Sequence, residues 1–510
     1  MANIKDHTRL TLKSWLHREI IEKKLVSFGG VSILVLLSIA LSYLLTQKDF
    51  FLIPFILIAA LLGILIVYCC LFRPLTGFYI VTTLAFLAFT PDHLLGVELP
   101  LSTGVELLLL FVFIGCFIFV KATAPTNKGL FTTPVSVALM IYSAYLLCEA
   151  FNPNIPDVSG WIFSFKRFAV YIFTYFIAYY LIDTPGKFKY FLKYWIVFSF
   201  AAGLYGCYQH WFGYLPMEMR FIRKNPVEYK LLFQGGELRN FSFLSDVVSF
   251  GVLAGGMAVI TLLLAINEKR KKNKYILWFF TIILILGMLY SGTRTTNIML
   301  PAGIALYTLL TIQSKRTMLI LFCSFIVVFL VLFAPVDNAS LNRIRSTFDN
   351  KEASLNVRDM NRHYIQPYIY RHPFGGGVAT SGVDGKRFYP NHLLAGFPPD
   401  SGFLKVALEQ GWIGLALTIF YNLMMLCQGI SYYFRMRNPQ YKLYMAAITA
   451  SLFSIIVTQY AQVSVGQIPH ALFIFSSISL MKRLLEFDEE ETARQLEKKD
   501  LVVALDKAIY

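Results

Sequence analysis

Long apolar runs recur along most of this chain, and they restrict its fold more than any other feature. Each run is roughly 18–24 residues long, which is the length that a helix needs to cross the hydrocarbon core of a bilayer. Because lipid offers no partners to backbone N–H and C=O groups, such runs must be helices. Hydrophobic residues make up 56% of the chain and charged residues only 15%, which excludes an ordinary soluble protein. The sequence therefore predicts an all-α, polytopic integral membrane protein.

The apolar pattern predicts about fourteen spans. Because a close pair of spans could instead form a re-entrant hairpin, the predicted bundle has about 12–14 transmembrane helices. The predicted spans are 28–47, 51–72, 75–90, 104–121, 133–151, 164–182, 191–212, 244–266, 275–291, 296–313, 317–334, 403–428, 441–462 and 469–485. They divide the chain into an amphipathic cytoplasmic arm at 1–27, spans one to eleven within 28–334, a large polar loop with short helices at 335–402, the last three spans within 403–485, and a charged cytoplasmic tail at 486–510. The arm mixes charged and apolar residues, unlike a cleavable signal peptide.

Lysine and arginine clusters predict which side of the membrane each loop faces. The clusters that share one side are the N-terminal arm, Lys187 to Lys193, Lys269 to Lys274, Lys315 and Arg316, Arg435 to Lys442, and Lys482 and Arg483. By the positive-inside tendency that side is the cytoplasm, so both termini are expected there. Loops 213–243 and 335–402 then face outside, together with the short junction around Arg294.

The two outer loops carry more positive charge than their orientation favours. Loop 213–243 holds five Lys and Arg residues against three acids, and loop 335–402 holds eight against six. An anionic ligand would explain this charge, and a solvated surface is the alternative. The net charge of +16 does not by itself indicate nucleic acid, because most basic residues flank membrane spans.

Three arginines are the first candidates for such a ligand site. Arg294 lies between two adjoining spans, and a charged group at membrane depth points by default to function, although an arginine can also extend its side chain to the interface. Arg358 and Arg362 lie one turn apart on a helix predicted from Leu355 to about Tyr370. Two guanidinium groups on one face could grip a phosphate, or could pair with Asp359 and other acids.

The polar loop gives weaker signals for other chemistry. The run Gly375 to Gly377 predicts a tight turn, and no strand or Lys-Ser/Thr pair accompanies it as a nucleotide-binding loop requires. The histidines of the loop fit no compact zinc pattern, so no metal site is predicted. His392 and Asp400 lie just before the twelfth span, and they are the more plausible proton acceptors.

Several short motifs together resemble one family of bacterial envelope enzymes. They are Ser291–Arg294 at a span junction, Ser354–Arg358, His372–Gly377, and an aromatic-Leu stretch from Phe403 through Glu409 and Gly411 to Gly414. In this order, with a large outer loop before the last motif, the chain resembles the O-antigen ligase and O-antigen polymerase superfamily over roughly residues 235–430.

This resemblance implies a GT-C-like membrane fold and a metal-independent glycosyl transfer, without a cofactor, at the outer face of the bacterial inner membrane. The implied donor is a glycan on undecaprenyl diphosphate. The implied acceptor is a lipid A core sugar, a second lipid-linked glycan or a protein hydroxyl. Arg294 and Arg358 match the two family arginines that hold the donor diphosphate, and Arg239 resembles a further basic position ahead of the eighth span.

The chain departs from the ligase pattern at the catalytic base. Where that pattern has a His-Asn pair, this chain has Asp400 and Ser401, while Asn391 and His392 lie eight residues earlier. An aspartate is already ionised at neutral pH but is a weak base, whereas a histidine is better matched, so both Asp400 and His392 remain candidates. Ligase and polymerase also remain open. The rival from another class is a lipid-linked glycan flippase or other secondary transporter.

Overall fold

The computed structural model describes residues 53–96, 100–121, 130–224, 229–230, 232–234, 236–312 and 353–509, together with residues 32, 35, 36, 38, 322 and 326. It divides into two compact units, Met1–Cys69 and Cys70–Tyr510, each described here by itself. In the first unit the described segment is most of helix α3 (Ile53–Phe72), which coincides with the second predicted span. The predicted arm lies outside the described residues, as do nearly all of the spans at 28–47 and 317–334.

The described part of the second unit is helical, apart from one short hairpin of strands β1 (Phe233–Gln234) and β2 (Glu237–Leu238). Its α-helices are α4 (Pro74–Leu87), α5 (Thr90–Leu95), α6 (Leu101–Gly115), α7 (Pro134–Cys148), α8 (Ser159–Leu181), α9 (Pro185–Phe212), α10 (Pro216–Lys224), α12 (Val247–Asn267), α13 (Lys271–Tyr290), α14 (Met299–Leu310), α17 (Ala353–Arg371), α18 (Gly382–Phe388), α19 (Gly402–Arg435), α20 (Pro439–Thr458) and α21 (His470–Ile509). Short turns of other helix types are η3 (Cys116–Lys121), η4 (Glu149–Phe151) and η5 (Arg294–Ile298).

Among the described residues, eight helical segments are long and apolar enough to cross a membrane. They are Pro74–Leu95, Leu101–Ile118, Pro134–Phe151, Ser159–Leu181, Val247–Asn267, Lys271–Tyr290, Gly402–Arg435 and Pro439–Thr458. Each overlaps a span predicted from the sequence. The prediction of an all-α polytopic membrane protein is confirmed.

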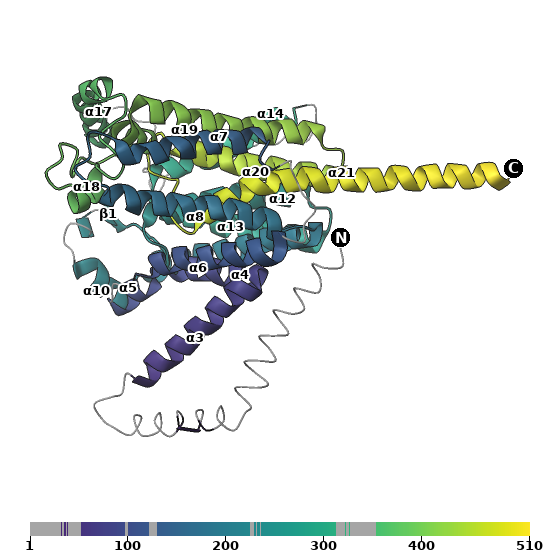
Figure 1. Cartoon of the computed structure of the whole chain (residues 1–510), viewed down its shortest axis with the longest axis horizontal. Helices are drawn as coiled ribbons and strands as arrows, with labels where there is room; N and C mark the ends of the chain where they lie inside the picture. Colours follow the sequence, from purple (N-terminus) through teal and green to yellow (C-terminus); the bar gives the residue numbers. More distant parts are fainter. Residues whose placement is uncertain are drawn as a thin grey trace. The chain divides into compact units, whose positions relative to one another are not determined.

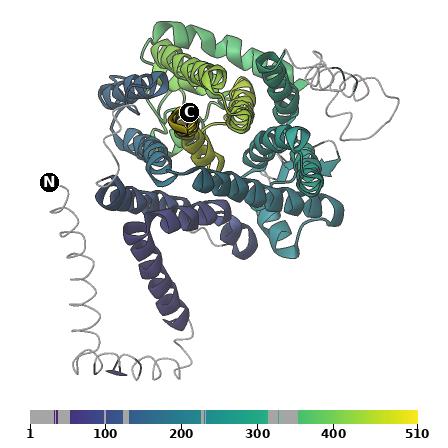
Figure 2. The same cartoon turned by 90° about the vertical axis from the view of Figure 1, so that its right-hand side faces the viewer.

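Two further helices, α9 and α21, coincide with predicted spans but are less apolar. The first part of α21 is buried from Ala471 to Leu485 except at Lys482, since it packs against α8, α9, α12, α19 and α20. Seen along the helices, α21 runs through the interior of the bundle (Figure 2). Helix α12 is the other central helix, because 89% of its apolar 18-residue segment is buried inside the protein.

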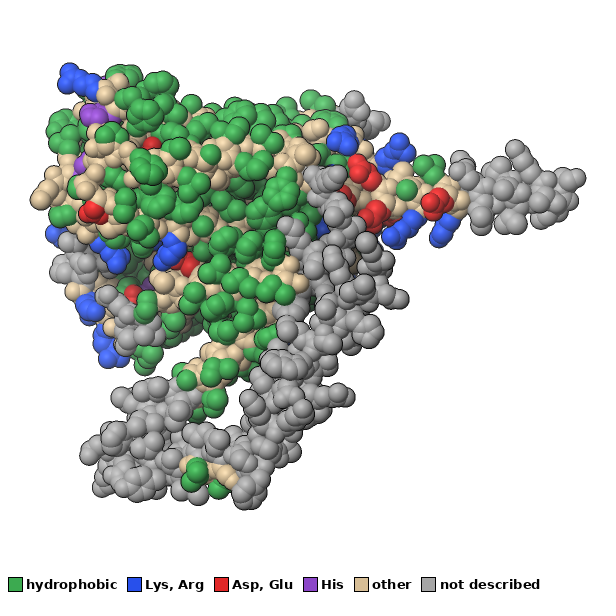
Figure 3. Space-filling view, in the orientation of Figure 1, with side chains coloured by type: hydrophobic (Ala, Val, Ile, Leu, Met, Phe, Trp, Pro, Cys, Tyr) green, Lys and Arg blue, Asp and Glu red, His purple; other side chains and the backbone are tan. Residues whose placement is uncertain are grey.

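Hydrophobic side chains cover the lateral face of the bundle, while Lys and Arg side chains gather toward its two ends (Figure 3). Large apolar residues stay exposed on several helices, among them Leu107 on α6, Ile162 on α8 and Phe279 on α13. A protein in water would bury such a surface, whereas a bilayer solvates it. The distribution of exposed side chains therefore agrees with the membrane assignment.

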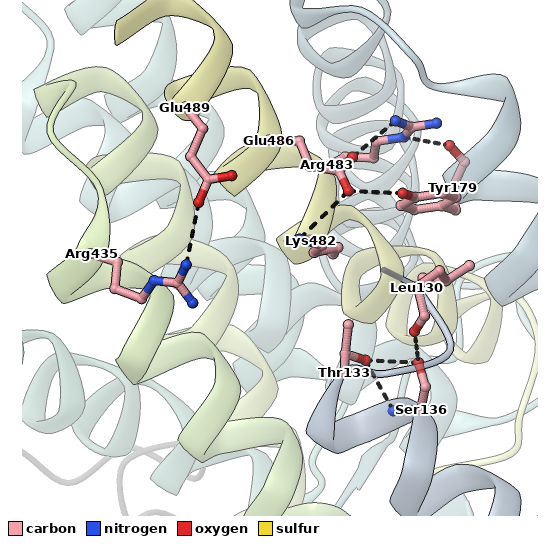
Figure 4. A network of polar contacts seen from close by, with 9 residues as sticks. All are labelled: Leu130, Thr133, Ser136, Tyr179, Arg435, Lys482, Arg483, Glu486 and Glu489. Atoms are coloured by element: carbon pink, nitrogen blue, oxygen red, sulfur yellow. Dashed lines mark hydrogen bonds and ion pairs between the residues drawn. The ribbon is translucent and has the colours of Figure 1, made fainter. Parts of the chain in front are cut away.

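At the end of the bundle away from α17, charged residues of α21 form ion pairs (Figure 4). The Arg483 guanidinium lies 3.9 Å from the centre of the Tyr179 ring, and it donates to the Tyr179 carbonyl at 2.8 Å and to the Glu486 carboxylate at 2.9 Å. Arg435 of α19 pairs with Glu489 at 3.3 Å. Because the buried Arg483 guanidinium would be costly without partners, its contacts with Tyr179 hold α21 against α8. The Arg435–Glu489 pair with α19 is exposed and adds little stability.

Candidate functional site

The polar elements of the second unit gather at one end of the bundle. Helices α10, α17 and α18 and the β1–β2 hairpin all lie at this end (Figure 1). The turn from Ser291 to Arg294 joins the end of α13 to η5, and the segment 389–401 leads into α19. The described parts of loops 213–243 and 335–402 and the span junction that the sequence analysis singled out therefore lie at the same end.

Two of the predicted diphosphate-binding arginines meet at the Ser291–Arg294 turn. Arg239 donates from Nη2 to the Thr293 hydroxyl at 2.9 Å and from Nε to the Ser291 carbonyl at 3.3 Å. Thr293 caps the turn η5, whose first residue is the half-buried Arg294. The fold thus brings the guanidinium of Arg239 onto the residues that directly precede Arg294.

This turn is tightly supported by the central helix α12. A methyl group at Gly251 would lie 2.5 Å from the Ser291 hydroxyl oxygen, so only glycine leaves room for the turn to approach α12 this closely. The Thr293 hydroxyl donates to the carbonyl of Val247 at 3.2 Å. These contacts position Arg294 through buried, packed residues, which is the arrangement that a precise ligand site requires.

Partly buried hydrogen bonds of Asp246, which precedes Val247, link the start of α12 to the segment after α20. Asp246, next to Val247, caps α12 by accepting from the backbone N–H groups of Val248 and Ser249 at 2.8 and 2.9 Å. Its other carboxylate oxygen accepts from Gln467 at 3.1 Å. The sequence analysis missed Asp246 as a positioning residue, although an aspartate directly before an apolar run is a recognisable N-cap signal.

Helix α17 carries the other two predicted arginines and agrees with the predicted helix. The side chain of Arg358 lies outside the described residues, so its predicted role stays a prediction. Arg362 donates to the Tyr460 carbonyl at 3.0 Å and to its hydroxyl at 3.3 Å, and its guanidinium lies 4.8 Å from the centre of that ring. Arg362 therefore ties α17 to the turn after α20, and any contact with a ligand would use its remaining N–H groups.

Asp400 is held near that same turn. The next residue, Ser401, is the N-cap of α19 and donates its hydroxyl to the Gln459 carbonyl at 2.9 Å. The Gly402 backbone N–H donates to the carbonyls of Gln459 and Gln462. Asp400 is half-buried and directly precedes the N-cap of α19.

His392, the second predicted base, has a less suitable hydrogen-bond arrangement. Its Nδ1 accepts from the backbone N–H of Leu394 at 3.1 Å, so the neutral ring carries its proton on Nε2. Burial, followed by the nearby His372, lowers the pKa of His392 below 6.5, which favours the neutral form. In this position the ring offers a donor and no free lone pair, so the geometry favours Asp400 over His392.

His372 has the opposite arrangement and was not considered as a base from the sequence. Its Nδ1 lies 2.8 Å from the Tyr368 carbonyl, to which it can only donate, and its ring stacks on that of Tyr368 at 3.9 Å. The Nε2 lone pair is then available to accept a proton. The signal was present in the His372–Gly377 motif, but a histidine tautomer depends on a contact that the sequence does not reveal.

The glycine run 375–377 forms a turn, as predicted, and it packs into a kink of α19. Gly375 and Gly377 have positive φ angles of 71° and 95°. The backbone N–H groups of Gly376 and Gly377 each donate at 2.8 Å, to the carbonyls of Leu408 and Glu409. Gly411 breaks the helix with a φ of 67°, and a methyl group there would lie 1.9 Å from the Pro373 carbonyl oxygen. The His372–Gly377 motif and the aromatic-Leu motif that contains Gly411 therefore pack against each other through their backbones.

Glu409 fixes this contact from within the protein. Its carboxylate is 3% exposed and accepts from the Ser381 hydroxyl at 2.5 Å and from the Ala379 N–H at 3.2 Å. Lys405, one turn earlier, lies 3.9 Å from Glu409 and 3.5 Å from Asp384. The sequence singled out Glu409 only as part of a motif, whereas the structure shows it as the anchor of the loop that leads to His392 and Asp400.

Comparison with known proteins now identifies this region. The family model described as O-antigen ligase matches residues 279–419. Residues 279–419 are thus similar to the O-antigen ligase family. The match confirms the resemblance to the O-antigen ligase and polymerase superfamily, and it indicates activity of the ligase or polymerase type. No curated protein matches the chain.

The matched segment runs from the middle of α13 to the middle of α19. It contains Arg294, Arg358, Arg362, His392 and Asp400, together with both sides of the glycine contact. Arg239, which binds the turn before Arg294, lies outside the matched segment. The family indicates a multi-pass bacterial membrane protein that uses a lipid-linked glycan donor and a glycan acceptor.

Proposed function

We propose that this protein transfers or polymerises a glycan carried on undecaprenyl diphosphate, at the outer face of the bacterial inner membrane. Arg294, Arg358 and Arg239 bind the diphosphate, and Arg362 borders the site. The observation that carries the proposal is the contact of Arg239 with the buried turn that presents Arg294.

The chemistry of arginine suits this role. A guanidinium makes paired, charge-assisted hydrogen bonds to phosphate oxygens and keeps its charge at any physiological pH. During transfer the bond from the anomeric carbon to the diphosphate breaks, and negative charge develops on the leaving oxygen. Fixed guanidinium groups stabilise that charge without a metal ion. The acceptor hydroxyl attacks the anomeric carbon as its proton passes to the base.

The placement of basic residues supports action at the outer face. The clusters that flank the spans at the opposite end of the bundle include Lys187 and Lys189 at the start of α9, Lys271 to Lys274 at the start of α13, and Arg435 at the end of α19. By the positive-inside tendency that end faces the cytoplasm, and the end that carries α17 and the arginines faces outward. Both termini are then cytoplasmic.

Asp400 is the proposed base, and its replacement tests the assignment. We expect Asp400→Asn to lower the rate of glycan transfer by about 100-fold or more, because a positioned base contributes roughly that much. His392→Asn should lower the rate by less than about fivefold, because the Nδ1 of His392 is already occupied by the Leu394 N–H. Initial rates of both variants at saturating donor decide between them. The reverse order of effects would assign the base to His392.

Reconstitution tests the whole proposal. The purified protein is inserted into liposomes that contain a lipid-linked glycan, and candidate acceptors are added without metal or nucleotide. We expect a new glycosidic bond: an elongated lipid-linked chain from a polymerase, a glycosylated lipid A core from a ligase, or a glycosylated protein from an oligosaccharyltransferase. Movement of intact donor across the bilayer without bond formation would instead support a flippase and would refute the transferase.

A further inference from the structure

A second cluster of cations lies on helices that the proposed donor site does not use. Lys166 and Arg167 of α8 and Arg387 of α18 surround the ring of Phe163, and their charged groups lie 5.7, 4.7 and 5.5 Å from its centre. Three positive charges from two separate helices thus converge on one aromatic side chain. The proposed function gives no role to any of them.

Among the described residues, the carboxylate of Glu106 is the one that forms ion pairs with this cluster. Glu106 of α6 lies 2.8 Å from Lys166 and 3.9 Å from Arg167. Within the part of the chain that the structure describes, no carboxylate lies within ion-pair distance of Arg387. The side chains of Lys166 and Arg167 are each 43% exposed, so the excess positive charge is accessible from outside the protein.

The cluster is held in a fixed position and is not a set of loose surface chains. The Tyr389 hydroxyl donates to the Asp157 carbonyl at 2.8 Å and accepts from the Gly160 N–H at 3.0 Å, which joins the end of α18 to the start of α8. The Phe163 and Phe388 rings contact each other at 5.0 Å. The cations on the two helices are therefore oriented before any ligand binds, which lowers the entropy that binding would lose.

Apolar side chains next to the cluster indicate the kind of ligand. Leu107, beside Glu106, is 53% exposed, and Ile162, one turn before Lys166, is 54% exposed. These side chains belong to α6 and α8, two helices with the length and composition of membrane spans. A ligand at this position would meet cations at its head and hydrocarbon-facing side chains along its body.

We propose that Lys166, Arg167 and Arg387 bind the phosphate head group of an anionic membrane lipid, whose acyl chains lie along the exposed faces of α6 and α8. Guanidinium and ammonium groups near a bilayer surface attract anionic lipids, and arginine pairs well with phosphate oxygens. None of these three cations is assigned to the proposed donor site, and lipid binding can be measured without a glycan substrate.

Arg387→Gln is the cleanest test, because it removes one cation and leaves the ion pairs of Glu106 intact. Native mass spectrometry of the purified full-length protein is carried out with phosphatidylglycerol and with phosphatidylcholine of the same acyl chains. We expect the wild type to bind its first phosphatidylglycerol about tenfold more tightly than phosphatidylcholine, and Arg387→Gln to lose most of that difference. Arg387→Lys should keep it, because the charge remains.

Arg494→Gln is the matched control, since Arg494 is an exposed arginine of α21 outside the cluster, and it should bind both lipids as the wild type does. Equal affinity of the wild type for the two lipids would overturn the proposal, as would an unchanged preference in Arg387→Gln. Inorganic phosphate is the third probe. If it bound as tightly as phosphatidylglycerol, the ligand would be a free phosphate and the assignment to lipid would be wrong.

Discussion

Arg294→Ala is expected to lower glycan transfer by about 100-fold or more while the protein still inserts and folds. Loss of one fixed donor to a developing negative charge typically costs a factor of 10²–10³ in rate. Arg294→Lys keeps the charge but not the planar pair of N–H groups, and should recover only part of the activity. The measurement is the initial rate of transfer by purified variants in liposomes, at matched protein levels.

Arg239→Ala should produce a smaller loss than Arg294→Ala, because the Nε and Nη2 groups of Arg239 already donate to Ser291 and Thr293 rather than to the ligand. Arg371→Ala is the matched control: Arg371 is an exposed arginine at the end of α17, at the same end of the bundle, and has no assigned role. The diphosphate-binding proposal fails if Arg294→Ala transfers glycan at the wild-type rate, or if Arg371→Ala is equally impaired.

Much of the architecture could be predicted because membrane helices leave a local signal. The spans follow from runs of apolar residues, and α17 follows from a helical pattern in the loop, so its predicted range from Leu355 to Tyr370 differs little from the observed Ala353–Arg371. The position of Arg294 between two apolar runs was equally visible. These features depend only on residues that are close to one another in the sequence, so one sequence is enough to predict them.

The contacts that assemble the site could not be predicted in the same way. Arg239 and Thr293 are 54 residues apart, and Arg362 and Tyr460 are 98 residues apart. Such pairs have no spacing rule, because they depend on how distant helices pack. The tautomer of His392 depends likewise on the Leu394 N–H, a detail that residue type alone does not fix.

The charged residues of α21 illustrate the same limit from the other end of the bundle. From the sequence, Lys482 and Arg483 indicated only a cytoplasmic orientation. In the structure Arg483 is 8% exposed and bonded to Glu486 and Tyr179, so it also joins helices. A positive residue near the end of a span can thus serve orientation and packing together, and only the fold separates the two roles.

Gly411→Ala is expected to disrupt the contact between α19 and the glycine run, and to abolish transfer as a consequence. The added methyl group would lie 1.9 Å from the Pro373 carbonyl oxygen and 2.5 Å from the Gly375 nitrogen. Both are backbone atoms, so no side chain can rotate away. The φ of 67° at Gly411 adds strain of about 1–3 kcal/mol for alanine. We expect a total loss of about 3 kcal/mol or more in the free energy of unfolding, measured in detergent.

Gly104→Ala is the control for this substitution. Gly104 lies inside α6, and a methyl group there would meet no atom within 4 Å. Because alanine favours a helix interior over glycine by about 1 kcal/mol, Gly104→Ala should be neutral or slightly stabilising and should keep full activity. The same chemical change is then harmful only where the backbone of the polar loop meets α19. Equal stability of the two variants would mean that this contact does not hold the loop, and that Glu409 and its partners position Asp400 without it.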